Sequence, residues 1–173
     1  MAVNIKFAKV RPDAKIPTKR REDAGYDLWP CFDQDWIEVP PLESRLIPTG
    51  IASSLDKDWA FIIRERGSTG VKNIKVSAGV IDSSFTGSWF VCIYNGNTVP
   101  LFISKFGETG EQSPLTEHPN AILYSYDKAI AQALLIHVPD VQIEVVDYEE
   151  ITARNTIRGD GQLGSTNISK TNL

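Results

Sequence analysis

Histidine and cysteine are both scarce in this sequence, which contains two of each among 173 residues. So few histidines argue against a Ser-His-Asp triad and against a metal site made of several histidines. Cys31 and Cys92 are far apart and lack the short spacing of a metal-binding pair. We therefore interpret them as reduced, buried thiols of a cytoplasmic protein.

Long hydrophobic runs and an excess of positive charge are absent as well. No apolar run approaches the roughly 20 residues that span a membrane, and the N-terminal stretch lacks the apolar core of a signal peptide. The formal net charge is -4, so the chain has no global basic field for a nucleic-acid backbone. Membrane and nucleic-acid partners are not expected, and a phosphate-bearing ligand would need a local group of cations, with a metal ion.

Short apolar segments separated by turn-forming residues recur along the chain. Val3, Ile5 and Phe7 alternate with polar neighbours, as the residues of a half-buried strand do, and the apolar residues of 141–145 repeat this pattern. Further strands are expected at Trp36 to Val39, Arg45 to Ile51, Trp59 to Ile63, Trp89 to Tyr94 and Val99 to Ile103. Many short strands with frequent turns predict an all-β barrel or sandwich.

The remaining segments set the expected domain organisation. The run from Ile130 to Val138 fits either a helical stripe or a buried strand, and a short helix is expected near Ser68 to Lys72. Residues 1–157 would form one β domain, with a polar surface excursion over residues 104–125. Residues 158–173 are rich in glycine, serine and threonine, and we expect them to be a flexible tail unless a ligand orders them.

Five short stretches combine glycines with charged, amide or hydroxyl side chains. In chain order they are Asp23 to Leu28, Arg64 to Gly70, Gly79 to Gly87, Ala129 to Gln132 and Arg158 to Thr166. Backbone N–H groups beside glycine, with arginine and hydroxyl side chains, suit an anionic ligand in the second and fifth stretches. Taken singly, each stretch also has a plain structural interpretation as a turn, a helix cap, a satisfied buried amide or a polar tail.

In this order, the five stretches resemble the five motifs of the trimeric dUTP pyrophosphatases (dUTPases). The family patterns are approximately A-G-Y-D-L, R-S-G or a G-S-T variant, G-x-I-D-x-x-Y-x-G, I-A-Q, and R-G-x-x-G-F-G-S-T. The resemblance runs from Asp23 to Thr166. It implies a jelly-roll-like β-barrel assembled as a homotrimer, with each active site between subunits, and it favours a strand after Ile130. It also implies hydrolysis of dUTP to dUMP and pyrophosphate with Mg2+.

The resemblance further implies roles for single residues. Asp82 corresponds to the general base that activates water for attack on the α-phosphorus, and Asp27 to the acid that holds Mg2+ through metal-bound waters. Phe85 stands where a tyrosine usually packs on the deoxyribose. The backbone implied to recognise the uracil edge belongs to Gly79, Val80 and Ile81.

Phosphate binding is implied for residues of the second, fourth and fifth stretches. Ser68 and Gln132 correspond to family residues that contact the phosphates. Because Gly67 splits the usual Arg-Ser pair, either Arg64 or Arg66 could be the phosphate cation, and we favour Arg64. The tail residues implied to close over the nucleotide are Arg158, Leu163, Gly164, Ser165 and Thr166.

The fifth stretch and the excursion depart from the family pattern as well. Leu163 replaces the phenylalanine that stacks over the uracil, and leucine covers less ring area. We hypothesise that this lid is weaker or that another aromatic residue supplies it, with Phe90, Tyr94 and Phe102 as candidates. The excursion over residues 104–125 is longer than the family pattern needs and could be the surface for a protein partner.

Two other functions compete with dUTP hydrolysis. A dCTP deaminase shares the fold but needs a catalytic glutamate near the uracil-reading hairpin, and Glu65 is the acid of the second stretch. The Ile-Asp turn and the Arg-Gly-rich tail favour hydrolysis instead. A binding or regulatory protein that keeps the fold without catalysis would not need Asp27, Asp82, Gln132 and Arg158 together.

Overall fold

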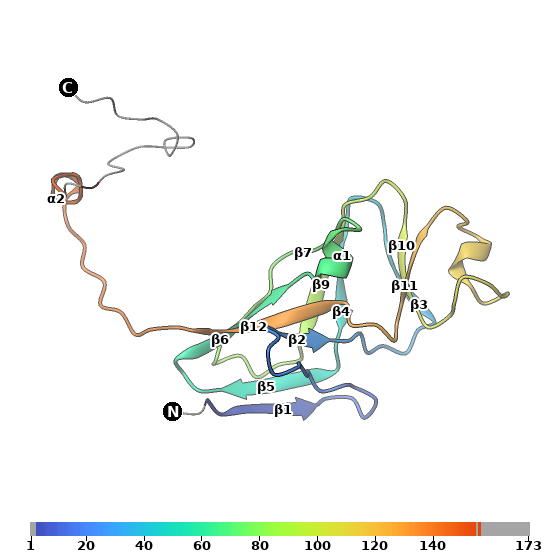
Figure 1. The fold of residues 1–173 in the computed structure, drawn as a ribbon, viewed down its shortest axis with the longest axis horizontal. Helices are drawn as coiled ribbons and strands as arrows, with labels where there is room; N and C mark the ends of the chain where they lie inside the picture. The colour runs from blue at the N-terminus through green and yellow to red at the C-terminus, as the bar shows by residue number, and fades with distance from the viewer. Residues whose placement is uncertain (1–2, 155, 157–173) are drawn as a thin grey trace, which may run out of the picture. The chain divides into compact units, whose positions relative to one another are not determined.

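The computed structural model describes residues 3–154 and 156, which fall into two compact units that divide between Pro139 and Asp140. The first unit is mostly β-structure (Figure 1). Its strands are β1 (Ile5–Lys9), β2 (Gly25–Leu28), β3 (Trp36–Val39), β4 (Ser44–Pro48), β5 (Ile51–Leu55), β6 (Trp59–Arg64), β7 (Ile74–Val76), β8 (Val80–Ile81), β9 (Phe90–Asn95), β10 (Leu101–Ser104), β11 (Ile122–Ser125) and β12 (Ala131–His137). It also contains the helix α1 (Gly67–Gly70) and the 3-10 helix η1 (Pro114–Thr116), and the second unit contains α2 (Tyr148–Thr152). No helix in the described part of the chain is both long and apolar enough for a membrane crossing.

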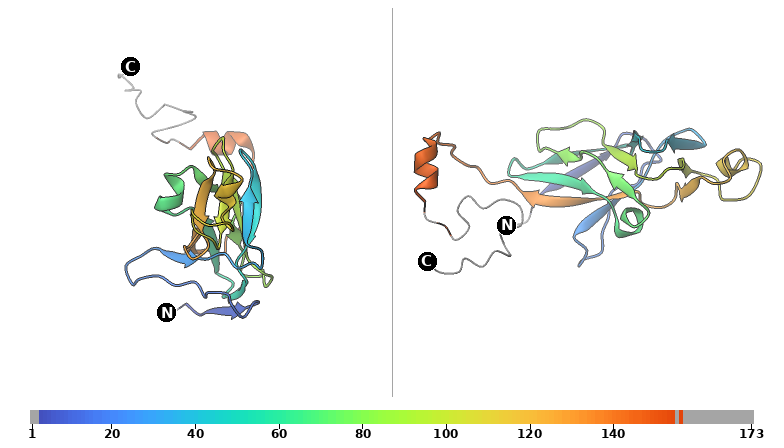
Figure 2. Two further views of the ribbon diagram at one scale, coloured as in Figure 1. Left: turned by 90° about the vertical axis from the view of Figure 1, so that its right-hand side faces the viewer. Right: turned by 90° about the horizontal axis from the view of Figure 1, so that it is seen from above.

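The strands of the described residues form four small sheets. Their strand orders are β2-β12-β6-β8, β4-β9-β7, β11-β10-β3 and β1-β5. The pairing of β10 with β11 is parallel, and the others are antiparallel. The excursion between β10 and β11 carries η1 and extends from this edge of the unit (Figure 1, Figure 2). Its last four residues form β11, which the sequence had placed within the polar loop.

The core of the first unit has Trp89 as its largest fully buried side chain. The indole packs edge-on against Phe7 and Phe61, with ring centroids 5.7 Å and 5.2 Å away. Val91 and Ile93, alternate residues of β9, are also buried, as the period of a half-buried strand requires. Because burial of apolar surface is the main stabilising term, this core fixes the strands whose ends carry the candidate site.

Most of the predicted strands are present with shifted ends. β3 has the predicted bounds, and the run after Ile130 is the strand β12 rather than a helix. The predicted strand Arg45 to Ile51 is two strands, because the chain turns at Gly50 with a φ of 67°. Both cysteines are free, but only Cys31 is buried, and Cys92 is partly exposed.

The strand predicted at residues 141–145 is wrong. Residues 138–147 belong to no strand, and the side chains that alternate there are exposed, Val145 by 94%. An alternating pattern makes a strand only where another strand pairs with it, and no described strand pairs with this segment.

Candidate functional site

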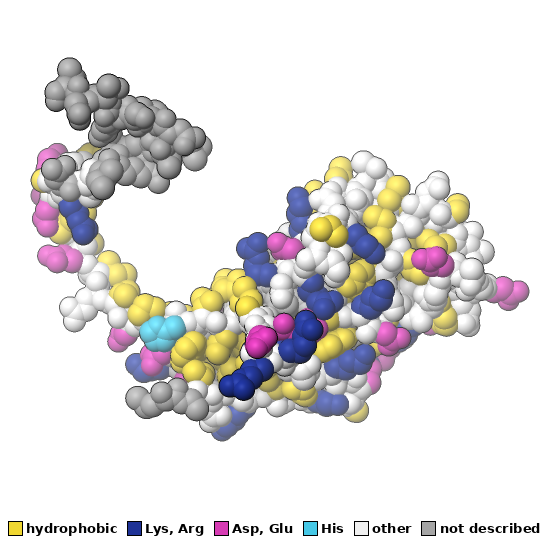
Figure 3. All heavy atoms as spheres, in the orientation of Figure 1, with side chains coloured by type: hydrophobic (Ala, Val, Ile, Leu, Met, Phe, Trp, Pro, Cys, Tyr) yellow, Lys and Arg dark blue, Asp and Glu magenta, His cyan; other side chains and the backbone are white. Residues whose placement is uncertain are grey.

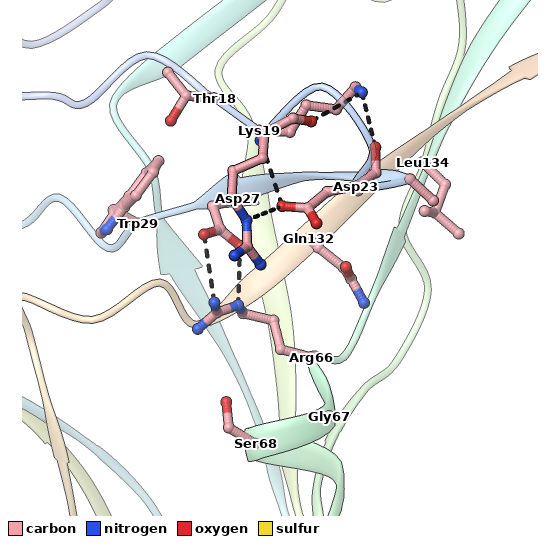
Figure 4. Close-up of a pocket in the computed structure, with 13 residues that line it drawn as sticks. Thr18, Lys19, Asp23, Asp27, Trp29, Arg66, Gly67, Ser68, Gln132 and Leu134 are labelled. Carbon is pink, nitrogen blue, oxygen red and sulfur yellow. Dashed lines mark hydrogen bonds and ion pairs between the residues drawn. The ribbon is translucent and has the colours of Figure 1, made fainter.

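Three of the five motif-like stretches meet in one cleft of the first unit, with a volume of about 860 Å³ (Figure 4). β12 lies between β2 and β6, and its register places Gln132 opposite both Asp27 and Arg64. Where the chain leaves β6 and begins α1, Arg66 and Ser68 join the lining. Antiparallel pairing therefore gathers residues that lie far apart in the sequence.

An ion pair between Asp27 and Arg66 lies in this cleft (Figure 4). Nε of Arg66 is 2.9 Å from Oδ1 of Asp27, and Nη2 donates to Oδ2 at 3.4 Å. Nη1 donates to the backbone oxygen of Ala129 at 3.3 Å. Each charged side chain is 33% exposed. The guanidinium is thus oriented by a two-pronged contact and is still reachable by a ligand.

Arg66 also begins the short helix α1 as its N-cap residue. The hydroxyl oxygen of Thr69 accepts a hydrogen bond from the backbone N–H of Arg66 at 2.9 Å, which is one half of a capping box, because an arginine side chain cannot accept the reciprocal bond. Ser68 is therefore not the cap, and it lines the cleft together with Gly67 (Figure 4). A Cβ on Gly67 would meet nothing within 4 Å, so the space above it is open.

Gln132 is positioned by Gly25, which lies on β2 two residues before Asp27, the register partner of Gln132. A Cβ on Gly25 would lie 2.3 Å from Oε1 of Gln132, so only glycine lets the amide lie over β2. Nε2 of Gln132 donates to the backbone oxygen of Glu65 at 2.9 Å and ties β12 to the turn before α1. The amide thus satisfies a backbone acceptor and lines the cleft at the same time.

Arg64, the cation favoured from sequence, is not part of the lining of this cleft. It is exposed at the end of β6 and lies 3.0 Å from Glu65 in an ion pair. Backbone hydrogen bonding, with a smaller contribution from Arg64, lowers the pKa of the Glu65 carboxyl.

Some lining residues were missed by the sequence interpretation. Lys19, Arg20 and Trp29, which lie outside the five stretches, line the cleft. The basic run of residues 19–21, directly before the first stretch, was a signal for Lys19 and Arg20. Figure 3 shows Lys and Arg side chains gathered on this face of the first unit. Tyr124 does not line the cleft: it is buried on β11, and its hydroxyl donates to the backbone oxygen of Ala129 at 2.7 Å.

Asp82 is not in this cleft. β8 pairs with β6 so that Ile81 faces Phe61, and Asp82 therefore lies level with Ala60. Ala60 is four residues along β6 from Arg64, or about 13 Å at the usual rise of a strand. The predicted hairpin of residues 79–87 is an exposed turn after β8 rather than two paired strands, because β8 pairs with β6 and β9 pairs with β4 and β7. Within one chain, the third stretch is thus separate from the first, second and fourth.

The other residues of this hairpin also face away from the cleft. Val80 and Phe85 are exposed apolar side chains, although Ile81 is buried. Gly79 has a φ of 118°, and a Cβ there would lie 2.9 Å from Cβ of Ile63, so the hairpin needs glycine at its base.

The fifth stretch, with Arg158, Leu163, Gly164, Ser165 and Thr166, lies outside the described residues. Of the three candidate replacements for the lid, Phe102 is excluded because it is 2% exposed and packs against Trp36 and His118. Phe90 and Tyr94 lie on the outer face of β9, and neither lines the cleft.

A magnesium ion would find one partly exposed carboxylate at the centre of the lining. Within residues 3–154 and 156, no group of three or more His, Cys, Asp and Glu side chains is placed to hold a metal. Asp27 nevertheless fits a hydrated Mg2+, which keeps several waters and takes other ligands from substrate phosphates.

Comparisons with known proteins identify the family of this chain. The family model described as dUTPase matches residues 13–107, more than half of the chain, which include the first three stretches. The deoxyuridine 5'-triphosphate nucleotidohydrolase of Arabidopsis thaliana is 32% identical over 168 residues, covering 95% of this chain and 83% of the plant protein.

Solved structures share the fold at lower identity. A dUTPase variant from Staphylococcus bacteriophage 80alpha, with dUpNHpp, has a TM-score of 0.71 and 18% identity over 95% of this chain and 99% of that one. A variant dUTPase from phage phi11 of S. aureus, known for the coordination of a structural Mg(II) ion, has a TM-score of 0.63 and 17% identity over 84% and 99%.

Proposed function

This chain belongs to the dUTPase family and hydrolyses dUTP to dUMP and pyrophosphate, and we propose that Asp82 is its general base, acting in a cleft that a neighbouring copy provides. One observation supports this arrangement most directly. The candidate phosphate-binding residues Arg66, Ser68 and Gln132 share one cleft, whereas the acid lies on an exposed hairpin elsewhere in the same chain.

A homotrimer would bring the hairpin of one copy over the cleft of the next. Besides Asp82, the hairpin exposes Val80 and Phe85, which suit contact with a uracil ring and a deoxyribose rather than with water. Leu46 and Phe90 are exposed on the outer face of the β4-β9-β7 sheet. This apolar sheet face suits packing between copies of the chain.

In the proposed reaction, Asp82 accepts a proton from the water that attacks the α-phosphorus. The bond from that phosphorus to the bridging oxygen breaks, and pyrophosphate leaves. Ser68, Gln132 and Arg66 bind phosphate oxygens and hold the triphosphate in line. Mg2+, held by Asp27 through metal-bound waters, would neutralise charge on the leaving group. The backbone of Gly79 to Ile81 recognises the uracil edge.

Pyrophosphate release from dUTP, dTTP, UTP and dCTP tests the proposed role of Asp82. We expect turnover of dUTP, little of the others, and a loss on the order of 10³-fold in Asp82→Asn, as removal of a general base predicts. Glu111→Gln, which removes an exposed acid from the excursion, is the matched control and should keep full turnover. Full turnover in Asp82→Asn would contradict the proposal, and ammonia release from dCTP would favour a deaminase.

The excursion is proposed as the surface for a protein partner. Ser113 and Pro114 are buried at its base, and Phe102 contacts His118 at a ring distance of 5.2 Å, whereas residues 107–112 are exposed. A loop with a packed base and an exposed tip can bind a partner without disturbing the cleft. Replacing residues 107–112 by a short Gly-Ser linker should leave dUTP turnover unchanged, and a large loss of turnover would assign the loop to the active site instead.

A further inference from the structure

The segment before β2 folds back on itself at the rim of the cleft. The backbone N–H of Asp27 donates to the oxygen of Thr18 at 2.8 Å, and that of Asp23 donates to the oxygen of Arg20 at 3.2 Å. These bonds define a turn over residues 19–23, which we call the basic turn. None of the five motif-like stretches includes Lys19, Arg20 or Arg21.

The ammonium group of Lys19 stabilises the basic turn from within. Its Nζ donates to the backbone oxygens of Arg20 and Arg21 at 3.3 Å each and to that of Asp23 at 2.7 Å. It also lies 5.5 Å from the centroid of the Tyr26 ring. Because its protons are committed to carbonyl oxygens, Lys19 orders the turn rather than binding a ligand.

Arg20 is arranged differently. Its Nε donates to Oδ2 of Asp23 at 2.9 Å, and its backbone N–H reaches the same oxygen at 3.3 Å. The side chain is 89% exposed, and among the described residues its terminal nitrogens have no hydrogen-bond partner. The Asp23 hydrogen bond, and at longer range Asp27, raise the pKa of Arg20. One edge of the guanidinium is thus fixed, and the outer N–H groups remain available.

The charge balance of the cleft favours a second phosphate-binding arginine. The ion pair with Asp27 partly neutralises Arg66, and a triphosphate carries several negative charges. A guanidinium held in place by a carboxylate binds phosphate oxygens with less loss of side-chain entropy than a mobile one does. Lys19 is committed to the turn, so Arg20 is the remaining lining cation that can meet the ligand.

We propose that Arg20, held by Asp23, is a substrate-binding residue that contacts a phosphate of dUTP beside Arg66. This inference rests on the proposed function, because it requires the triphosphate to occupy this cleft. Arg20 increases the affinity for the triphosphate and takes no part in making or breaking bonds. Its loss therefore weakens binding of phosphorylated ligands and leaves binding of the bare nucleoside unchanged.

Arg20→Ala and Arg21→Ala form a matched pair of variants. They remove the same charge from adjacent positions, but Arg20 lines the cleft and Arg21 does not. Calorimetric titration with dUpNHpp should show about a tenfold weaker affinity for Arg20→Ala, the loss of one charge-assisted hydrogen bond, and little change for Arg21→Ala. Inhibition by deoxyuridine should be unchanged in both variants, and Arg20→Lys should recover part of the affinity.

Two outcomes would overturn the role of Arg20. Equal dUpNHpp affinity in the two alanine variants would show that only general charge matters. Parallel losses of dUpNHpp and deoxyuridine affinity, with a lowered Tm, would show that Arg20 only maintains the fold of the turn. Turnover of dUTP by Asp82→Asn separates either result from failure of the proposed function, in which that variant would keep full turnover.

Discussion

The cleft and the hairpin of residues 79–87 differ in how their polar groups are satisfied. In the cleft, Asp27 is paired with Arg66, and the amide of Gln132 is bound to a backbone oxygen. On the hairpin, Asp82 is exposed, with apolar side chains beside it. The register of the strands brings the residues of the cleft together within one chain. The exposed side chains of the hairpin, by contrast, have no ligand-binding partners near them among the described residues of the same chain. Under the proposed function, the two regions are complementary halves of a site.

The largest expected effect is on dUTP turnover, in assemblies that combine a variant altered in the hairpin with a variant altered in the cleft. Asp82→Asn and Arg66→Ala should each lower dUTP turnover by roughly 10²-fold or more, because each removes a group that acts in the transition state. Co-expression of the two variants should restore part of the activity, since some sites would combine an intact hairpin with an intact cleft. The measurement is pyrophosphate release from the purified mixture.

A second mixture controls for this experiment. Asp82→Asn co-expressed with Phe85→Ala leaves no intact hairpin, so activity should not return. If the first mixture also stays inactive while its assembly state matches the wild type, the two halves do not come from different copies.

Gly25→Ala should damage the cleft and spare the hairpin. The new Cβ would lie 2.3 Å from Oε1 of Gln132 and must displace that side chain. We expect KM for dUTP to rise about tenfold and the free energy of unfolding to fall by about 1–3 kcal/mol. Gly107→Ala, where a Cβ meets nothing within 4 Å, is the control for steady-state kinetics and Tm. An unchanged KM would remove Gln132 from the binding residues.

Gly79→Ala should damage the hairpin and spare the cleft. Its φ of 118° and the approach to Ile63 would force the base of the hairpin to move, at a cost of about 1–3 kcal/mol. We expect a severalfold lower kcat from the displaced Asp82. Inhibition by inorganic triphosphate, which would bind in the cleft alone, should be unchanged. A weaker inhibition would show that the two regions are coupled within one chain.

The smallest effect concerns acid stability near the cleft. The hydrogen bond from Arg20 lowers the pKa of Asp23. A carboxyl with a lowered folded pKa stabilises the fold above its unfolded pKa of about 3.9, and this contribution is lost as pH falls through the folded pKa. Arg20→Ala should therefore show a slightly shallower fall of Tm toward acid pH than Arg21→Ala, because the pair is exposed. NMR titration should find the pKa of Asp23 raised in Arg20→Ala alone.

The sequence predicted the regular strands well, because burial on one face produces an alternating pattern. The same rule failed at Val141 to Val145, where the pattern is present and no described strand pairs with it. An alternating pattern shows which side chains a strand could bury. Whether the strand forms depends on its pairing with residues that are distant in the sequence.

Within the candidate site, motif order identified Asp27, Ser68 and Gln132, which the structure brings together. Strand alternation offered no way to choose between Arg64 and Arg66, because β6 ends at Arg64 and the chain then turns into α1. The basic turn was missed for a similar reason: its position depends on backbone hydrogen bonds between Thr18 and Asp27.

The ion pair of Arg66 with Asp27 has a consequence for selectivity among anions. A ligand that binds the guanidinium of Arg66 must replace its ion pair with Asp27. A small ion such as inorganic phosphate makes too few new contacts to compensate for the carboxylate left unpaired. A chelating polyphosphate with its own counter-cation can satisfy both partners at once. The abundant simple anions of the cell should therefore compete weakly for this site.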